Sequence, residues 1–256
     1  MTTETQQTRV LLSGNQTGGV IAMAESRVPA GWEGPPPHRR DFDETFYVLD
    51  GDLTFQLGEE LVIAGPGALA CAPGGTMRAV ANRGERPARY LRFSTPAGPA
   101  PEPSAAGPRI GERGDLDRAR RLPLDRRHVN VLLRGDESGG RIALMDNFIG
   151  TGGSGPPMHR HDFDELFCVL EGELTFRLGD ELVTRRAGGH AFVARGAVHT
   201  FANFGASPAR TLIVCTPAGF ERYFARIAAE LAGEQVPEWA LEPWPEVTKV
   251  GPPLGG

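Results

Sequence analysis

The sequence repeats itself at an offset of 121 residues without a gap. Leu11 falls on Leu132, residues 38–51 fall on residues 159–172, and the Thr-Pro-Ala-Gly segment at 95–98 recurs at 216–219. A repeat of this length indicates one structural unit present twice, with about 100 residues in each copy. The two copies differ at the positions that carry chemistry.

Each copy has the residue pattern of an all-β domain. Short segments rich in Val, Leu, Phe and Thr alternate with Gly, Asp and Pro, which is typical of strands joined by tight turns. Gly172 and Gly179 mark such turns in the second copy, and Gly51 and Gly58 mark them in the first. The strands predicted for the second copy are residues 141–149, 165–170, 173–178, 181–185, 190–194, 200–204 and 210–216.

The repeat also predicts the domain organisation. Residues 1–98 form the N-terminal barrel, and residues 99–126 form a linker that is rich in Pro, Gly and Ala where it begins. Residues 127–219 form the C-terminal barrel, and residues 220–256 form a short helix and an extended tail. In that helix Phe220, Phe224, Ile227 and Leu231 share one face at helical spacing, which predicts packing on the outside of the barrel.

Composition excludes several functional classes. The net charge of −5 and the pI of about 5.7 argue against a nucleic-acid-binding surface. The first residues contain no apolar core of a signal peptide, and no apolar run approaches membrane-spanning length, which predicts a cytoplasmic protein without a membrane contact. The odd number of cysteines, without metal or redox spacing, predicts buried free thiols at Cys71, Cys168 and Cys215.

The second copy contains a pattern of metal ligands. His159, His161 and Glu165 lie at i, i+2 and i+6, and would project to one face of a chain that is extended or nearly so; His199 follows downstream. Three imidazoles and one carboxylate suit Fe, Mn, Ni, Co or Zn as divalent ions and leave coordination positions open. A closed structural zinc site would use cysteines, and none stands at this spacing.

The first copy has lost part of this pattern. His38 and Glu44 remain, but Arg40 and Arg78 stand where the second copy has histidines. Arginine stays protonated and cannot coordinate a cation. The two guanidinium groups would either neutralise Glu44 in a degenerate site or bind an anionic ligand. We therefore predict one divalent transition metal per chain, bound only by the second copy.

Two motifs of the second copy resemble those of the cupin superfamily. The pattern Gly153-x5-His159-x-His161-x3-Glu165-x6-Gly172 resembles the first cupin motif at every position. The pattern Gly188-x5-Ala194-x-Gly196-x2-His199-x3-Asn203 resembles the second, with Ala194 where proline is usual. In the first copy Trp32 replaces the first glycine, whereas Gly67, Pro73, Gly75 and Asn82 keep the turn of the second motif without its histidine.

The resemblance implies a bicupin, an all-β chain of two tandem jelly-roll barrels. It implies that His159, His161, Glu165 and His199 bind the metal. It also implies that the two barrels pack as an intramolecular pseudo-dimer, and it leaves further homo-oligomerisation open.

Within the superfamily, residues 159–172 and 219–224 most resemble quercetinase-like proteins. That likeness implies a dioxygenase acting on an electron-rich phenol or enol, such as a flavonol or polyketide, with Glu165 as the general base. Phe167 points to the same face of its strand as Glu165, and Phe201 to the same face as His199, so both are predicted to contact the substrate. Met158 and Phe192 are further candidates.

Two other functions remain open because the fold alone does not specify a reaction. One is a non-redox, metal-dependent cyclase or isomerase, and the other is a non-catalytic small-molecule-binding protein. A transcription factor is disfavoured because no helix-turn-helix pattern or basic segment flanks the repeat. Oxalate-degrading bicupins are disfavoured because they resemble this chain less around the His-x-His sequence.

Overall fold

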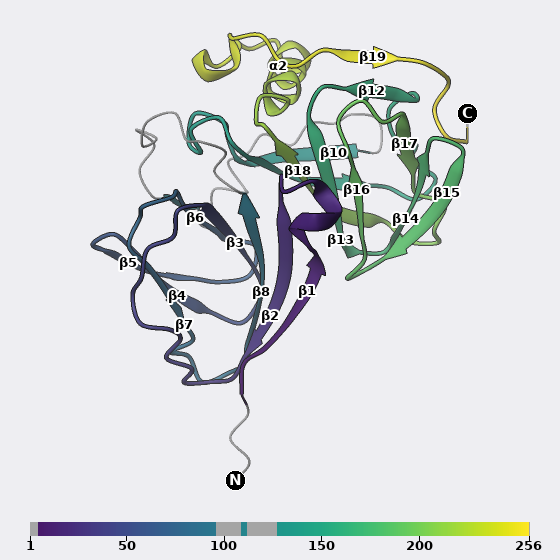
Figure 1. The fold of residues 1–256 in the computed structure, drawn as a ribbon. Helices are drawn as coiled ribbons and strands as arrows, with labels where there is room; N and C mark the ends of the chain where they lie inside the picture. Colours follow the sequence, from purple (N-terminus) through teal and green to yellow (C-terminus); the bar gives the residue numbers. More distant parts are fainter. Residues whose placement is uncertain (1–4, 96–108, 112–126, 256) are drawn as a thin grey trace. The chain divides into compact units, whose positions relative to one another are not determined.

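The computed structural model describes residues 5–95, 109–111 and 127–255. The chain divides into two compact units, one of residues 1–118 with 137–139 and one of residues 119–136 with 140–256. Both units are built almost wholly of antiparallel strands (Figure 1). The prediction of two tandem all-β barrels with a short C-terminal helix is confirmed.

The second unit consists of two five-stranded sheets. The strands of one sheet are, in spatial order, β10 (Arg127–Leu133), β11 (Ala143–Ile149), β18 (Ala209–Thr216), β13 (Asp164–Glu171) and β16 (His190–Val193). The strands of the other are β15 (Glu181–Arg186), β14 (Glu173–Leu178), β17 (His199–Ala202), β12 (His159–His161) and β19 (Val247–Lys249). The helix α2 (Glu221–Ala232) and a 3₁₀ turn η2 (Glu238–Ala240) lie between β18 and β19 in sequence.

The first unit repeats this plan with a six-stranded and a three-stranded sheet. The larger sheet contains β1 (Gln7–Leu12), β2 (Ala22–Val28), β8 (Ala88–Thr95), β3 (Asp43–Asp50), β6 (Leu69–Ala72) and β9 (Arg109–Gly111) in that order. The smaller contains β5 (Glu60–Ala64), β4 (Leu53–Leu57) and β7 (Arg78–Ala81), and a 3₁₀ turn η1 (Gly14–Thr17) follows β1. At the place of β12 the first unit has only a single bridge, between His38 and Arg78.

All seven strands predicted for the second copy are present, with ends within two residues of the predicted ones. The strands β10, β12 and β19 were not predicted. Most of the predicted linker, residues 99–126, lies outside the described residues. Within it Arg109–Gly111 forms β9 and pairs with β6. Such pairing uses backbone groups and needs no alternating side-chain pattern, so the sequence did not reveal it.

Aromatic and aliphatic side chains fill the interior of each unit. Phe167, Phe176 and Phe201 lie in the core of the second unit, to which Phe224 of α2 also belongs. The predicted helix is confirmed, but Leu231 is 60% exposed, so its placement on the packed face was wrong. The three cysteines are free and buried, as predicted. No helix among the described residues is long and apolar enough to cross a membrane.

Candidate metal centre

Three strands of the second unit bring the predicted ligands together. His159 on β12 pairs directly with His199 on β17, and His161 follows on β12. Glu165 lies on β13 in the opposite sheet, because the chain bends at residues 162–163. The expectation that residues 159–165 are extended was therefore wrong: the side chains converge because the two sheets face each other.

The four side chains are close together and buried. Each of His159, His161 and His199 offers one ring nitrogen as a possible metal ligand, and these three atoms lie within 4.8 Å of one another. Such a group of three could hold a metal ion. The Glu165 Oε2 atom lies 3.1 Å from His161 Nε2 and 3.0 Å from His199 Nε2. Each of the four residues is at most 5% exposed.

Backbone carbonyl groups fix the orientation of all three imidazole rings. In each case Nδ1 lies within hydrogen-bond distance of a carbonyl oxygen two residues away: Pro157 for His159 (2.9 Å), Phe163 for His161 (2.8 Å) and Ala197 for His199 (3.1 Å). A carbonyl oxygen only accepts, so Nδ1 carries the proton and donates. In the neutral ring Nε2 then has a free lone pair, which is the tautomer that a metal ligand requires.

In this tautomer two ring nitrogens and a carboxylate oxygen, all hydrogen-bond acceptors, face one another. The lone pairs of His161 Nε2 and His199 Nε2 face the carboxylate oxygen of Glu165, so the contacts are favourable only with a proton or a metal cation between them. Burial, and next the charge of His199, lower the pKa of His159 to about 4, which keeps that ring neutral. Burial raises the pKa of Glu165, but hydrogen bonds that His161 and His199 donate when their Nε2 atoms carry a proton outweigh this effect and lower the pKa well below its usual range. The donor set therefore fits a divalent cation.

A glycine turn and an aspartate fix the loop before His199. Gly196 has a φ of 77°, a conformation that only glycine adopts readily. Asp164 accepts a hydrogen bond from the backbone N–H of Arg195 (3.0 Å) and forms an ion pair with its guanidinium group (2.6 Å). The first unit keeps the same device, because Asp43 accepts a hydrogen bond from the N–H of Gly74. Residues 78 and 199 are thus presented by equivalent loops.

An aromatic stack supports the His161 ring, and the sequence did not reveal it. The Phe163 ring lies parallel to the His161 ring with a centroid distance of 3.6 Å. Phe220, just before α2, stacks on Phe163 at 5.0 Å, and Tyr223 stacks on Phe220 at 5.5 Å. The nearness of Phe163 to the His-x-His sequence was the only signal available, and the role of Phe220 depends on where the helix lies.

The structure separates the four predicted substrate residues into two pairs. Phe167 and Phe201 are buried in the barrel core, and the Phe167 ring lies 6.5 Å from the His199 ring. Phe192 pairs with Leu166, the neighbour of Glu165, so it faces away from the ligands because alternate residues of a strand point to opposite faces. Met158 lies in a bend just before β12, where its backbone bonds to Val250 and Pro252 of the C-terminal tail. The structure therefore does not bring Phe192 to the cluster, and Met158 lies outside the three strands that carry it.

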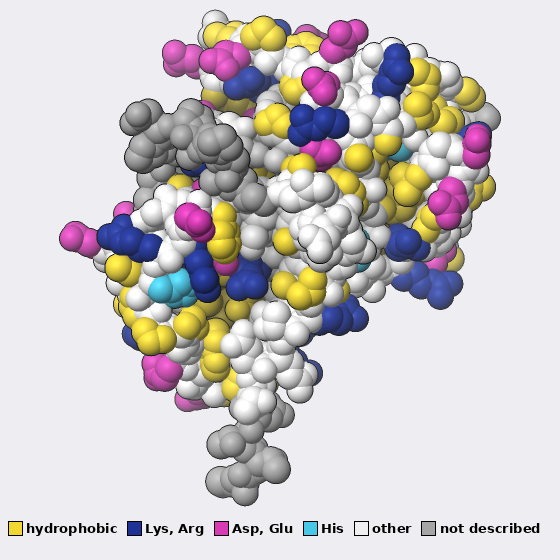
Figure 2. All heavy atoms as spheres, in the orientation of Figure 1, with side chains coloured by type: hydrophobic (Ala, Val, Ile, Leu, Met, Phe, Trp, Pro, Cys, Tyr) yellow, Lys and Arg dark blue, Asp and Glu magenta, His cyan; other side chains and the backbone are white. Residues whose placement is uncertain are grey.

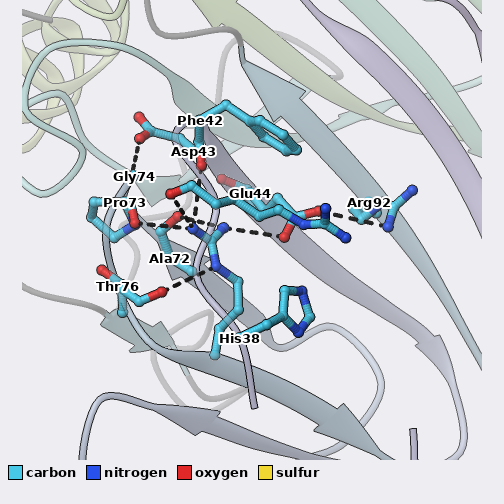
Figure 3. A network of polar contacts seen from close by, with 12 residues as sticks. His38, Phe42, Asp43, Glu44, Ala72, Pro73, Gly74, Thr76 and Arg92 are labelled. Carbon is cyan, nitrogen blue, oxygen red and sulfur yellow. Dashed lines mark hydrogen bonds and ion pairs between the residues drawn. The ribbon is translucent and has the colours of Figure 1, made fainter. Parts of the chain in front are cut away.

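In the first unit a guanidinium group lies beside the corresponding glutamate. Arg78 Nη1 donates to Glu44 Oε2 at 3.1 Å, and both residues are almost fully buried. The other hydrogen bonds of this guanidinium go to backbone carbonyl oxygens, those of Ala72, Pro73, Phe42, Arg40 and Thr76, at 3.3–3.5 Å. Figure 3 shows Ala72, Pro73 and Thr76 on one side of this network and Glu44 on the other. Burial lowers the pKa of Arg78, and the ion pair with Glu44 opposes that effect.

The second guanidinium group at Glu44 is not the predicted one. Arg92 Nη1 lies 3.6 Å from Glu44 Oε1, a contact drawn in Figure 3. The Arg40 side chain is exposed and lies over the Phe42 ring, at 5.9 Å from its centroid. The interpretation that Arg40 neutralises Glu44 is corrected, because Arg92 on β8 supplies that second charge. His38 is half-buried, and its Nδ1 donates to the carbonyl of Pro36.

The fold and the site together define a protein of two β-barrels, one of which carries a cluster of three histidines and a glutamate. The Cupin domain family matches residues 24–93 and 149–215, which is more than half of the chain. The chain therefore belongs to the cupin family and contains two cupin domains.

Solved structures share this two-barrel fold at low sequence identity. A putative glyoxylate-induced protein from Pseudomonas aeruginosa is 15% identical and superposes with a TM-score of 0.69, over 82% of this chain and 80% of its own. Oxalate decarboxylase from Lactobacillus farciminis is 12% identical, with a TM-score of 0.68 over 94% and 92%. The coconut allergen cocosin is 9% identical, with a TM-score of 0.68 over 84% and 82%. No curated protein sequence matches the chain.

Proposed function

We propose that the second barrel binds one divalent transition metal through His159, His161, Glu165 and His199, and that the chain is a metal-dependent oxygenase. The observation that carries the proposal is the orientation of the three rings. Their Nδ1 protons are bound by carbonyl groups, so their Nε2 lone pairs are free to meet at one point beside Glu165. Nitrogen and oxygen donors in this combination suit Fe, Mn, Ni, Co or Zn as divalent ions.

The surroundings of the cluster support an electron-rich, weakly polar substrate. The Phe167 ring lies 6.5 Å from the His199 ring, and Phe201 and Ile213 belong to the same apolar core as Phe167. The first barrel has Arg92 at the position of Ile213, so the second barrel lacks that cation. A small dianion such as oxalate, the substrate named for the oxalate decarboxylase neighbour, would find an apolar wall there. A phenol or enol, flavonol-like or polyketide-like, fits this wall better, in line with the resemblance to quercetinase-like cupins.

The residues of the chain have separate roles in this proposal. The three histidines hold the metal, and their carbonyl partners prevent the rings from rotating. A bound divalent metal lowers the pKa of a coordinated hydroxyl group. Glu165 has the position to accept the proton that this hydroxyl loses, because its carboxylate faces the same point as the Nε2 atoms. The Phe163 ring keeps His161 in place, and the phenylalanines of the core exclude water from beneath the site.

A non-redox cyclase or isomerase is the second candidate. The donor set that suits redox-active ions also suits Zn, which would support deprotonation of the substrate without oxygen chemistry. Glu165 would then have the same role as a base. A non-catalytic binding protein would show neither reaction.

Oxygen consumption by the metal-loaded chain tests the proposal. We expect oxygen uptake with at least one member of a panel of flavonols and polyphenols, and loss of that uptake in a His159→Ala/His199→Ala variant. The matched control, His38→Ala in the first barrel, should keep the uptake, because His38 lies in the other unit. Turnover of a substrate without oxygen uptake would establish the cyclase or isomerase class instead. Absence of turnover with every member of the panel would contradict the enzyme proposal.

A further inference from the structure

The first barrel contains a cavity of about 350 Å³ beside the buried Arg78–Glu44 pair. This volume lies within the range of about 300–1,000 Å³ that is usual for small-molecule sites. Every residue that lines it belongs to the first unit. Basic side chains and a histidine gather on the visible face of this unit (Figure 2). No proposed step in the second barrel uses this cavity.

The charged side chains of the cavity wall leave an excess of positive charge. Arg40, Arg78 and Arg92 line it together with one carboxylate, Glu44. Arg78 alone is sufficient to compensate Glu44, because the two are 3.1 Å apart and both are buried. Arg78 has no free donor to offer a ligand, since backbone carbonyls accept its remaining hydrogen bonds. Arg40 and Arg92 are therefore additional to what Glu44 needs.

Both of these arginines are accessible from the cavity. Arg92 Nη1 is a loose 3.6 Å from Glu44 Oε1, and the Arg92 side chain is 38% exposed, so its guanidinium group can meet an acceptor in the cavity. The Arg40 guanidinium lies at the exposed side of the same cavity, over the Phe42 ring. Two guanidinium groups on one cavity wall are suited to a carboxylate, which accepts such paired hydrogen bonds.

The rest of the wall is apolar and aromatic. Trp32, Phe46, Val80 and Tyr90 line the cavity beside the arginines. At three of these positions the second copy has a different side chain, with Gly153 in place of Trp32, Phe201 in place of Val80 and Thr211 in place of Tyr90. The first barrel thus has an added aromatic wall and a smaller side chain next to its extra arginines. This combination suits a ring-sized apolar body attached to the anionic group.

From this geometry we propose that the first barrel is a metal-free binding site for a small aromatic carboxylate, held by Arg92 and Arg40 and packed against Trp32 and Tyr90. Arg78 and Glu44 do not bind the ligand directly. They form the polar floor of the site, where the second barrel has its candidate metal ligands. The inference is independent of the reaction proposed for the second barrel.

Titration of the full chain with benzoate, followed by tryptophan fluorescence and calorimetry, tests this site, and benzamide is the neutral control. We expect benzoate to bind, benzamide to bind at least about tenfold more weakly, and Arg92→Ile or Arg40→Gln to weaken benzoate binding by about tenfold or more. Arg92→Ile places in the first barrel the residue that the second barrel has at this position. Arg89→Gln is the matched control, because Arg89 lies on the same strand and pairs with Glu25 instead.

Four results would overturn the proposal. They are equal binding of benzamide, no binding of benzoate at millimolar concentration, equal weakening by Arg89→Gln, and loss of benzoate binding when a chelator removes metal. The last result would place the ligand at the second barrel. Thermal unfolding of each variant shows whether it is folded, and the exposed Arg40 provides a test even if Arg92→Ile proves unstable.

Discussion

Replacing Arg78 with methionine should destabilise the first barrel strongly. The substitution leaves Glu44 buried without its closest partner, and the Arg78 and Glu44 side chains are only 2% and 4% exposed. Breaking a buried ion pair on one side costs about 3–5 kcal/mol. Arg92 remains 3.6 Å from Glu44, with a side chain 38% exposed, so it keeps part of the compensation. We therefore expect the unfolding free energy to fall by about 3 kcal/mol, near the lower end of this range.

Urea unfolding measured through Trp32 provides the assay, in a Trp239→Phe/Trp244→Phe background that silences the second unit. The unfolding free energy falls by about 2 kcal/mol for each molar of urea, so the urea midpoint of unfolding should fall by about 1.5 M. The double variant Arg78→Met/Glu44→Gln should lose about 2 kcal/mol less unfolding free energy than the sum of the losses in the two single variants. When both residues change, no unpaired charge of this pair stays buried. Additive losses would refute the view that these two residues act as one buried pair.

Three further predictions concern other parts of the chain. Burial raises the pKa of Tyr90 from 10.0, so the stability that its neutral phenol contributes is complete below pH 10 and is lost as the pH rises further. In urea unfolding, Tyr90→Phe should therefore lose less unfolding free energy at alkaline pH than the wild type. Phe163→Leu should weaken metal affinity about tenfold by freeing the His161 ring, measured by competition with a chromophoric chelator, whereas the exposed Phe204→Leu should leave the affinity unchanged. Gly196→Ala should lower stability by about 1–2 kcal/mol in thermal unfolding, because its φ is 77°, and an unchanged midpoint would show that the loop relaxes.

The sequence predicted the fold well because each long strand carries a local signal. The strand β14, for example, alternates Leu174 and Phe176 inward and is bounded by a glycine turn at each end. The short strands β12 and β19 carry no such signal, since three residues cannot show a period. Their pairing depends on where the tail returns to the barrel, which is a property of the folded chain. Leu231 was misplaced because the helical period continues beyond the part of α2 that packs on the barrel.

The candidate metal site was predictable to the same extent. Motif spacing identified the four residues that converge, although the chain between His161 and Glu165 bends where an extended segment was expected. The contribution of Arg92 could not be predicted, because it reaches Glu44 from β8, a strand distant in sequence. Alternation along a strand, with the strands already assigned, would have shown that Phe192 faces away from the ligands.

Metal content per chain tests the central claim most directly. The chain should be purified after growth with a mixture of divalent transition metals and analysed by elemental mass spectrometry. We expect about one metal per chain, because the first barrel has arginine where two ligands would be needed. His159→Ala/His199→Ala should abolish it, and the matched variant His38→Ala/Glu44→Gln should leave it unchanged. Two metals per chain, or metal retained after loss of His159 and His199, would contradict the account.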